Sequence, residues 1–257
     1  MQLFGLDAEV LAHSERGDGR HWVLKVELDG RPLVVKLYGR KRDWLRDFLR
    51  DVGQRFLVGK SGMTPAARMQ TERATLELWH RHGFRVPRVL DATLPAEVPK
   101  LRLVLESIEG GTVRDLLADP RVPLMEKRRV TAQCVSEWTR RHELALRLRE
   151  PGLIQVHATF GHVLRSGDAL VTFDFEVAWR RRDVERLVEI ELLGFLGSFG
   201  PWVAADQLDL LLETVVAGYS PRDRLAAVAR SWRGRRSPAD AAVLERLARA
   251  LERAGNS

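Results

Sequence analysis

The sequence predicts an α+β protein with a small β-rich N-terminal lobe and a larger helical C-terminal lobe. Near the N-terminus, two apolar runs with strand character, at 21–28 and 32–38, flank a Gly-containing turn. After a glycine-rich segment at 108–112, patterns with helical periodicity dominate. Because such a segment marks a linker between compact parts, we predict an N-lobe at 1–107 and a C-lobe at 108–257.

The elements are expected in the following order. Asp29-Gly30-Arg31 joins the first two strands as a hairpin, and 44–55 has helical periodicity. Residues 64–83 form a longer helical pattern that ends in a His-Gly C-cap signal, and an apolar strand follows at 101–107. In the C-lobe we expect helices at 113–118, 124–149, 182–195, 206–218, 222–233 and 238–254, with short strands near 163–164 and 170–173.

The composition is that of an ordinary soluble globular protein, with 45% hydrophobic and 30% charged residues among 257. The single cysteine, Cys134, excludes an internal disulfide framework, suits a reducing compartment and lies at an apolar position of a helical pattern. No signal peptide is apparent at the N-terminus, and the longest weakly polar run is shorter than the ~20 residues that span a bilayer. We therefore expect a cytoplasmic protein.

The net charge is +7, and only six of the 42 basic residues are lysines. This excess of arginine either reflects the base composition of the genome or provides a surface for anionic partners such as phosphates and acidic lipids. The sequence contains no zinc-finger spacing or other nucleic-acid-binding module, which argues against a nucleic-acid partner.

Two charged residues with the spacing of a pair lie in the N-lobe. Lys36 stands inside the apolar run 33–38, where a lysine points outward from an edge strand or into a cleft with a counter-charge. An unpaired buried ammonium would lose its proton. Glu72 lies on the following helix, and alone it would be a solvated helix residue. Their order and separation predict an ion pair across a nucleotide cleft.

An acidic pair follows a later apolar strand. Asp174 comes directly after residues 170–173 and either caps a turn or offers a hard oxygen ligand to magnesium. Glu176 is either a second oxygen ligand or a surface residue.

Several of these segments resemble a known superfamily. Residues 72–90, the hinge-like 103–112 and the motif 171–176 resemble the atypical branch of the protein-kinase-like superfamily. This branch holds the RIO and Bud-type kinases and especially the lipopolysaccharide-core (Kdo and heptose) kinases. The resemblance spans roughly residues 13–198. The motif at 171–176 has glutamate where those kinases have glycine.

The resemblance implies a bilobal protein-kinase-like fold that binds ATP with Mg or Mn. It implies that Lys36 contacts the phosphates, that Glu72 fixes the lysine, and that Asp174 binds the metal. Glu106, in the hinge-like segment, is implied to contact the nucleotide. Asp183, at the start of the next helix, is expected to act as an N-cap and to help hold the catalytic loop.

The catalytic loop departs from the kinase pattern. Kinases place a base Asp and a metal-binding Asn five residues apart, with an apolar pair after the Asn. Here His157 and His162 have that spacing and precede Val163-Leu164, which puts His157 at the base position and His162 at the metal position. A competing register puts Thr159 at the Asp position and needs a two-residue deletion. The alternative without a catalytic role is that both histidines are polar residues that fill a tight loop.

Under either register the carboxylate base is missing. Imidazole can still act as a general base, and as a softer ligand it favours manganese over magnesium. The sequence thus predicts an ATP-dependent phosphotransferase acting on a glycolipid or lipopolysaccharide-core, small-molecule or protein hydroxyl. The alternative is a pseudokinase that regulates a partner protein. A third class is a module that binds RNA or lipid through the arginine-rich surface. For the kinase-like protein we expect a monomer or weak dimer with an anionic or glycolipid acceptor and peripheral contact with the inner membrane face.

Overall fold

The computed structural model describes the chain except residues 15–20, 40–58, 62–63, 181–182, 232–237 and 256–257. It divides into two compact units, each described here by itself. The first comprises Met1–Glu109 with Phe173–Arg181, and the second comprises Gly110–Thr172 with Arg182–Ser257. The domain boundary at residues 107 and 108 stays a prediction, and the helix predicted at 44–55 lies outside the described residues.

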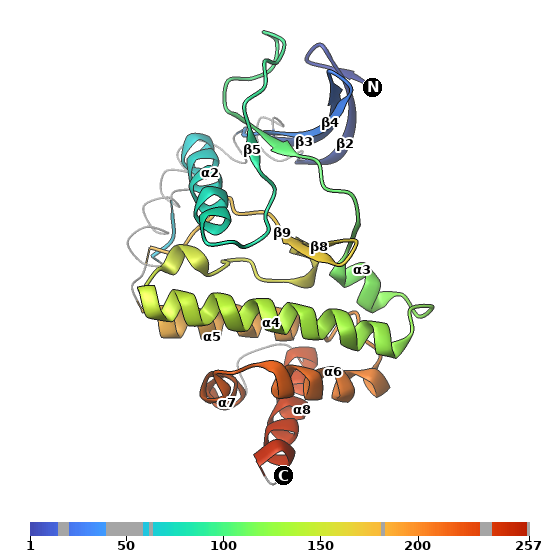
Figure 1. Ribbon diagram of the computed structural model, residues 1–257, viewed down its shortest axis with the longest axis vertical. Helices are drawn as coiled ribbons and strands as arrows, with labels where there is room; N and C mark the ends of the chain where they lie inside the picture. Colours follow the sequence, from blue (N-terminus) through green and yellow to red (C-terminus); the bar gives the residue numbers. More distant parts are fainter. Residues whose placement is uncertain (15–20, 40–58, 62–63, 181–182, 232–237, 256–257) are drawn as a thin grey trace. The chain divides into compact units, whose positions relative to one another are not determined.

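A six-stranded antiparallel sheet forms most of the first unit (Figure 1). Its strands, in spatial order, are β1 (Gln2–Leu3), β2 (Leu6–Ser14), β3 (His21–Leu28), β4 (Arg31–Leu37), β6 (Arg102–Glu106) and β5 (Val89–Leu90). The predicted hairpin between β3 and β4 is confirmed, with Leu28 opposite Arg31. Its turn residues Asp29 and Gly30 have φ of 51° and 70°, the left-handed values that a two-residue hairpin turn requires.

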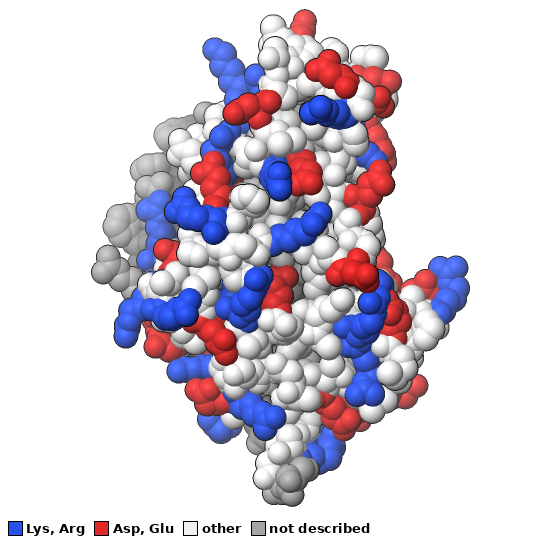
Figure 2. Space-filling view, in the orientation of Figure 1, with Lys and Arg blue, Asp and Glu red and all other residues white. Residues whose placement is uncertain are grey.

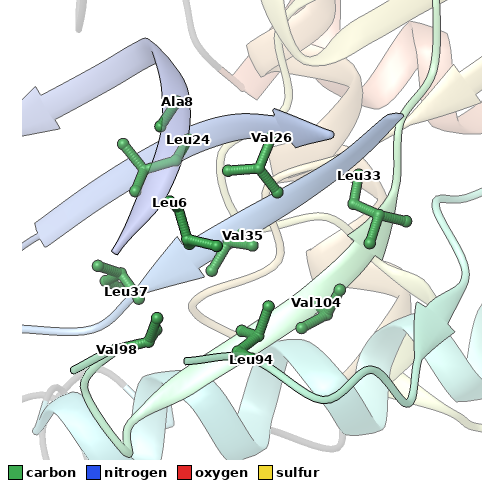
Figure 3. Packing of buried hydrophobic residues seen from close by; sticks show 10 residues of the cluster. All are labelled: Leu6, Ala8, Leu24, Val26, Leu33, Val35, Leu37, Leu94, Val98 and Val104. Atoms are coloured by element: carbon green, nitrogen blue, oxygen red, sulfur yellow. The ribbon is translucent and has the colours of Figure 1, made fainter. Parts of the chain in front are cut away.

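Alternation along β4 gives its two faces different roles. Leu33, Val35 and Leu37 point into an apolar cluster with residues of β3, β6 and the loop before β6 (Figure 3). Val35 and Leu37 are fully buried, and burying such a side chain stabilises the fold by about 1.5–3 kcal/mol. Because successive side chains of a strand point to opposite faces, Lys36 projects from the other side of the sheet.

The helix α2 (Pro65–Arg81) confirms the prediction for residues 64–83. Thr64 caps its N-terminus by accepting a hydrogen bond from the backbone N–H of Ala67, with Pro65 in the first turn. It ends before Gly83, whose φ is 75°. The buried residues of α2 have helical spacing and include two charged ones: Arg68, Glu72, Thr75, Leu76 and Trp79. Buried charges require partners, so this face must meet further charged groups.

The second unit is mainly helical, as predicted. Its helices are α3 (Val113–Ala118), α4 (Leu124–Leu148), α5 (Val184–Gly197), α6 (Ala205–Gly218), α7 (Arg222–Ser231) and α8 (Pro238–Gly255). A small antiparallel sheet has the order β7 (Gly111–Thr112), β8 (Val163–Ser166), β9 (Ala169–Thr172), and two short 3-10 helices are η2 (Pro151–Leu153) and η3 (Phe160–His162). The long helix α4 supplies the core residues Trp138 and Cys134.

Cys134 lies in the core, as predicted, and burial raises the pKa of its thiol well above the ordinary value. A thiol in this setting stays protonated and unreactive. Within the described parts of the chain, none of the helices has the length and apolar character needed to cross a membrane.

Candidate functional site

The predicted ion pair between Lys36 and Glu72 is confirmed. The ammonium Nζ of Lys36 lies 2.7 Å from Oε2 and 2.9 Å from Oε1 of Glu72. Both side chains are almost fully buried, at 7% and 2% exposed. Tyr38, two residues along the same face of the chain, donates its hydroxyl to Oε2 of Glu72 at 2.6 Å. The glutamate is therefore held from two sides, and it holds the lysine in turn.

Two further carboxylates surround the same lysine. Asp174 Oδ1 lies 3.4 Å and Glu176 Oε1 lies 3.5 Å from the Nζ of Lys36. Burial alone would lower the pKa of Lys36, but the attraction of Glu72, Asp174 and Glu176 outweighs it and raises the pKa above the ordinary value. The lysine is consequently a permanent cation in a carboxylate cluster.

Residues 173–180 make backbone and ring contacts with the rest of the first unit. Ser61 donates its N–H to the carbonyl of Ala178 at 2.8 Å, and Phe175 packs against Trp79 of α2 at 4.7 Å between ring centroids. These contacts fix the short segment from Asp174 to Glu176. Asp174 has a φ of 70°, a left-handed conformation that non-glycine residues rarely adopt. Such strain is retained where the surroundings over-determine it, and it is common at functional sites.

The three carboxylates differ in their access to solvent. The side chain of Asp174 is 35% exposed, whereas those of Glu72 and Glu176 are 2% and 10% exposed. Asp174 is therefore the carboxylate that a dissolved ion or ligand reaches most readily.

Glu176 is buried. Of the two roles expected for it, a second oxygen ligand or a surface residue, the surface role is therefore wrong. Its Oε2 accepts a hydrogen bond from Arg68 at 3.0 Å, and its Oε1 lies 3.0 Å from Nε2 of His21. Arg68 also donates to the carbonyl of Gly39. Sequence reasoning missed Arg68, His21 and Tyr38. A spacing of four residues between Arg68 and Glu72 on a buried helix face was the available signal.

The cluster fits a divalent cation. Glu72, Asp174 and Glu176 each offer a carboxylate oxygen, and these three atoms lie within 4.8 Å of one another. Carboxylate oxygens are the hard ligands that magnesium and manganese accept. The ammonium of Lys36 lies within 3.5 Å of a carboxylate oxygen of all three residues, so a cation at this cluster would share these oxygens with the lysine. From the sequence, Asp174 was predicted as a metal ligand and Glu176 as either a second ligand or a surface residue, whereas Glu72 was not named as a ligand.

The loop that carries the two predicted histidines lies in the second unit. Nδ1 of His162 lies 2.8 Å from the backbone carbonyl oxygen of His157. Because a carbonyl only accepts hydrogen bonds, Nδ1 of His162 carries a proton in this contact. Metal-binding histidines are oriented in this way. The hydroxyl of Thr159 accepts from the N–H of Gly161 at 3.3 Å and caps η3.

The remaining predicted site residues are placed as follows. Glu106 ends β6, and its Oε2 accepts from the N–H of Arg88 at 3.4 Å. Asp174 belongs to the first unit, and His157 and His162 belong to the second. The joint role of Asp174 and His162 as metal ligands, like the nucleotide contact of Glu106, stays a prediction.

A buried charged network anchors the chain just before this loop. Glu191 of α5 accepts a hydrogen bond from the N–H of Gln155 at 3.1 Å through Oε2. Arg141 of α4 donates to Glu191 Oε1 at 2.6 Å and to the carbonyl of Leu153 at 2.7 Å. Asp183 caps α5 by accepting from the N–H of Arg186 at 3.1 Å, as predicted. Glu191, which the sequence did not indicate, thus anchors the chain before the loop, and the loop-holding role of Asp183 stays a prediction.

We expect Glu191→Gln to lower the free energy of unfolding by about 3–5 kcal/mol, because the buried Arg141 loses the carboxylate at 2.6 Å and keeps only Glu137 at 3.7 Å as a counter-charge. Chemical denaturation measures this effect. Glu185→Gln, on the same helix but without a buried ion pair, is the control and should change the stability by less than about 0.5 kcal/mol. Equal effects of the two substitutions would show that the network does not carry the stability assigned to it.

Two surface cavities lie away from this cluster, beside α2 and β5. Their volumes are about 260 and 330 Å³, and both are lined by Arg73 and Asp91. None of the carboxylates around Lys36 lines either cavity. The site is therefore recognised by its charge arrangement rather than by these hollows.

Comparisons with known proteins identify the fold. No protein-family model matches the chain, and no curated protein matches it in sequence. Among solved structures, "WaaP in complex with acyl carrier protein" is similar, with a TM-score of 0.50 and 14% identity. The match covers 96% of this chain and 89% of that chain. The chain therefore has the bilobal α+β kinase-like fold predicted from its sequence, with a β-rich N-terminal sheet and a helical C-terminal part.

Proposed function

We propose that the protein is an ATP-dependent phosphotransferase of the lipopolysaccharide-core kinase type. The observation that carries this proposal is the buried pair of Lys36 and Glu72 with Asp174 beside it. A lysine fixed by a glutamate, next to a solvent-accessible carboxylate, is the arrangement by which kinases hold nucleotide phosphates and metal. Fold similarity alone would not support an activity, but these side chains supply the chemistry.

The residues have distinct roles in this proposal. Lys36 neutralises phosphate oxygens, and Glu72 with Tyr38 keeps the lysine in place. Asp174 and Glu176 would hold a divalent cation, and the spacing of the catalytic loop puts His162 at the position of a further ligand. When bound, the cation neutralises charge that develops on the phosphates. Glu106 contacts the nucleotide at the hinge.

His157 orients or deprotonates the acceptor hydroxyl. Its side chain is exposed, so an acceptor can reach it. Because the transition state of phosphoryl transfer is loose, positioning and charge neutralisation provide most of the rate, and a weak base suffices. Imidazole is such a base near neutral pH.

A glycolipid or lipopolysaccharide-core hydroxyl is the acceptor that we favour, with a small molecule or a protein as alternatives. The sequence motifs resemble lipopolysaccharide-core kinases, and the solved structure of similar fold is that of WaaP with acyl carrier protein. A partner protein is accordingly a second class of partner to test. Figure 2 shows the described basic side chains interspersed with acidic ones on the visible face. Charge on that face alone therefore does not mark the partner surface. Such an acceptor would place the protein at the cytoplasmic side of the inner membrane.

A pseudokinase that regulates a partner protein is the second candidate. Positions 157 and 159 carry His and Thr in place of a carboxylate base, and the hydroxyl of Thr159 is used to cap η3. The surroundings of Lys36 argue against an empty scaffold, because a buried charge cluster of this kind is costly to keep without a ligand to bind.

Thermal-shift measurements with ATP test the proposal. We expect millimolar ATP with manganese to raise the melting temperature more than ATP with magnesium, because imidazole is a softer ligand than carboxylate. Manganese or magnesium without ATP is the control for metal binding alone. No shift by ATP with either metal would leave only the nucleotide-free scaffold.

A further inference from the structure

An arginine and an exposed tryptophan lie beside the histidine loop in the second unit. The guanidinium carbon of Arg114, on α3, lies 5.4 Å from the centroid of the Trp202 ring. A Cβ built on Gly161 would lie 3.5 Å from Nη1 of Arg114, an ordinary van der Waals distance. Arg114 therefore bridges the loop residue next to His162 and the indole.

One edge of this guanidinium is left for a ligand. Nε and Nη2 of Arg114 both donate to Oδ1 of Asp115 at 3.1 Å. Nη1 makes no hydrogen bond to any residue that the structure describes, and the side chain is 41% exposed. An arginine oriented by a neighbouring carboxylate and open at its other edge is ready to bind an oxyanion.

The indole is exposed but held in place. Trp202 is 44% exposed, unusual for so large an apolar side chain. Its backbone N–H donates to the carbonyl of Phe199 at 3.1 Å. The ring of Phe199, fully buried, packs on the buried Phe160 of η3 at 4.7 Å between centroids. Phe199 thus links the backbone of Trp202 to the ring of Phe160 in the histidine loop, which also packs on Trp138 and Phe195.

We infer that Arg114 and Trp202 form an acceptor subsite for a phosphorylated sugar. This inference rests on the proposed function and names the acceptor chemistry. The guanidinium lies over one side of the Trp202 ring, so the apolar C–H face of a sugar ring would contact the part of the indole that Arg114 leaves open, while the guanidinium binds phosphate through parallel hydrogen bonds. The carboxylate of Asp115, 60% exposed, accepts from sugar hydroxyls. The missing side chain of Gly161 leaves room for the sugar to approach His162 and His157.

Nuclear magnetic resonance of the tryptophan indole N–H groups tests this subsite on the full chain. Trp202→Phe identifies the signal of Trp202 among the seven tryptophans. Glucose 6-phosphate is the probe, and glucose and inorganic phosphate each supply one of its two features. We expect glucose 6-phosphate to shift the Trp202 signal with millimolar affinity. Each single-feature compound should bind at least about tenfold more weakly.

Arg114→Gln should weaken the response to glucose 6-phosphate by about tenfold or more, because it removes the charge-assisted hydrogen bonds of the guanidinium. Arg121→Gln is the matched control, since Arg121 is likewise exposed and bonded to a neighbouring aspartate. It should leave the response unchanged. If Arg114→Gln alters the dispersion of the spectrum, Arg114→Lys replaces it and should show an intermediate loss, since the charge remains but the planar fork does not.

Three results would overturn the inference. They are a Trp202 signal that does not respond to glucose 6-phosphate, an equal response in Arg114→Gln, and a response to anionic vesicles that the sugar phosphate does not reduce. The last would mark a membrane contact instead. ATP binding of the same sample separates the two proposals. ATP binding without a sugar response refutes the subsite alone, and a sugar response without ATP binding refutes the proposed function alone.

Discussion

Asp174→Asn is expected to remove the metal-dependent part of ATP binding. Asparagine keeps the size and one oxygen of the side chain but loses the negative charge that holds the cation. Substituting even an outer-shell partner of a metal costs about 10–100-fold in affinity, so the loss at a direct ligand should be at least that large. Calorimetric titration with ATP and manganese measures the change.

The fold should survive this substitution, because Lys36 keeps its bond to the buried Glu72. Asp168→Asn is the matched control: Asp168 is an exposed aspartate on the β8–β9 turn that pairs with Arg129. It should bind ATP and manganese like the unsubstituted protein. Undiminished binding by Asp174→Asn would remove Asp174 from the metal site.

His157→Ala is expected to reduce phosphoryl transfer by about 10²–10⁴-fold, the usual contribution of a general base. Nucleotide affinity should barely change, because the imidazole serves the acceptor rather than ATP. In the unsubstituted protein, turnover should also decline in acid, since a protonated imidazole no longer accepts a proton. Steady-state kinetics with separate measurement of ATP binding distinguishes these effects. Full activity of His157→Ala would contradict the role assigned to His157, and the register that puts Thr159 at the Asp position would be tested next.

The reverse substitution, His157→Asp, separates the enzyme from the pseudokinase. It restores the carboxylate that kinases use at this position. If the unsubstituted protein is silent and this variant transfers phosphate, the natural protein is a pseudokinase that lost its base. If the unsubstituted protein is active, the aspartate variant should retain activity. Its turnover should no longer decline near neutral pH as the pH is lowered.

Local patterns predicted the part of the site that lies on regular elements. The apolar run around Lys36 and the helical pattern around Glu72 predicted that the two residues pair, and both lie on the expected elements, β4 and α2. The hairpin turn at Asp29 and Gly30 followed from residue types that tolerate left-handed φ. Each of these features depends on neighbours within a few residues.

The features that the sequence did not reveal depend on distant partners. Glu176 is buried because Arg68, 108 residues earlier in the chain, meets it. Glu191 anchors the chain before the histidine loop across a separation of 36 residues. A single sequence contains no local signal for such pairs, since a lone Glu on a helix is most often solvated. Asp183, in contrast, has a local N-cap signal and acts as that cap.

A crystal structure with a non-hydrolysable ATP analogue and manganese tests most directly whether the cluster around Lys36 holds metal-bound nucleotide. We predict that phosphate oxygens lie within hydrogen-bond distance of the Nζ of Lys36 and that the metal is bound by Asp174. Anomalous scattering identifies the manganese. A nucleotide-free structure at saturating analogue, with Asp174 still beside Lys36 and no metal on the carboxylates, would contradict the account.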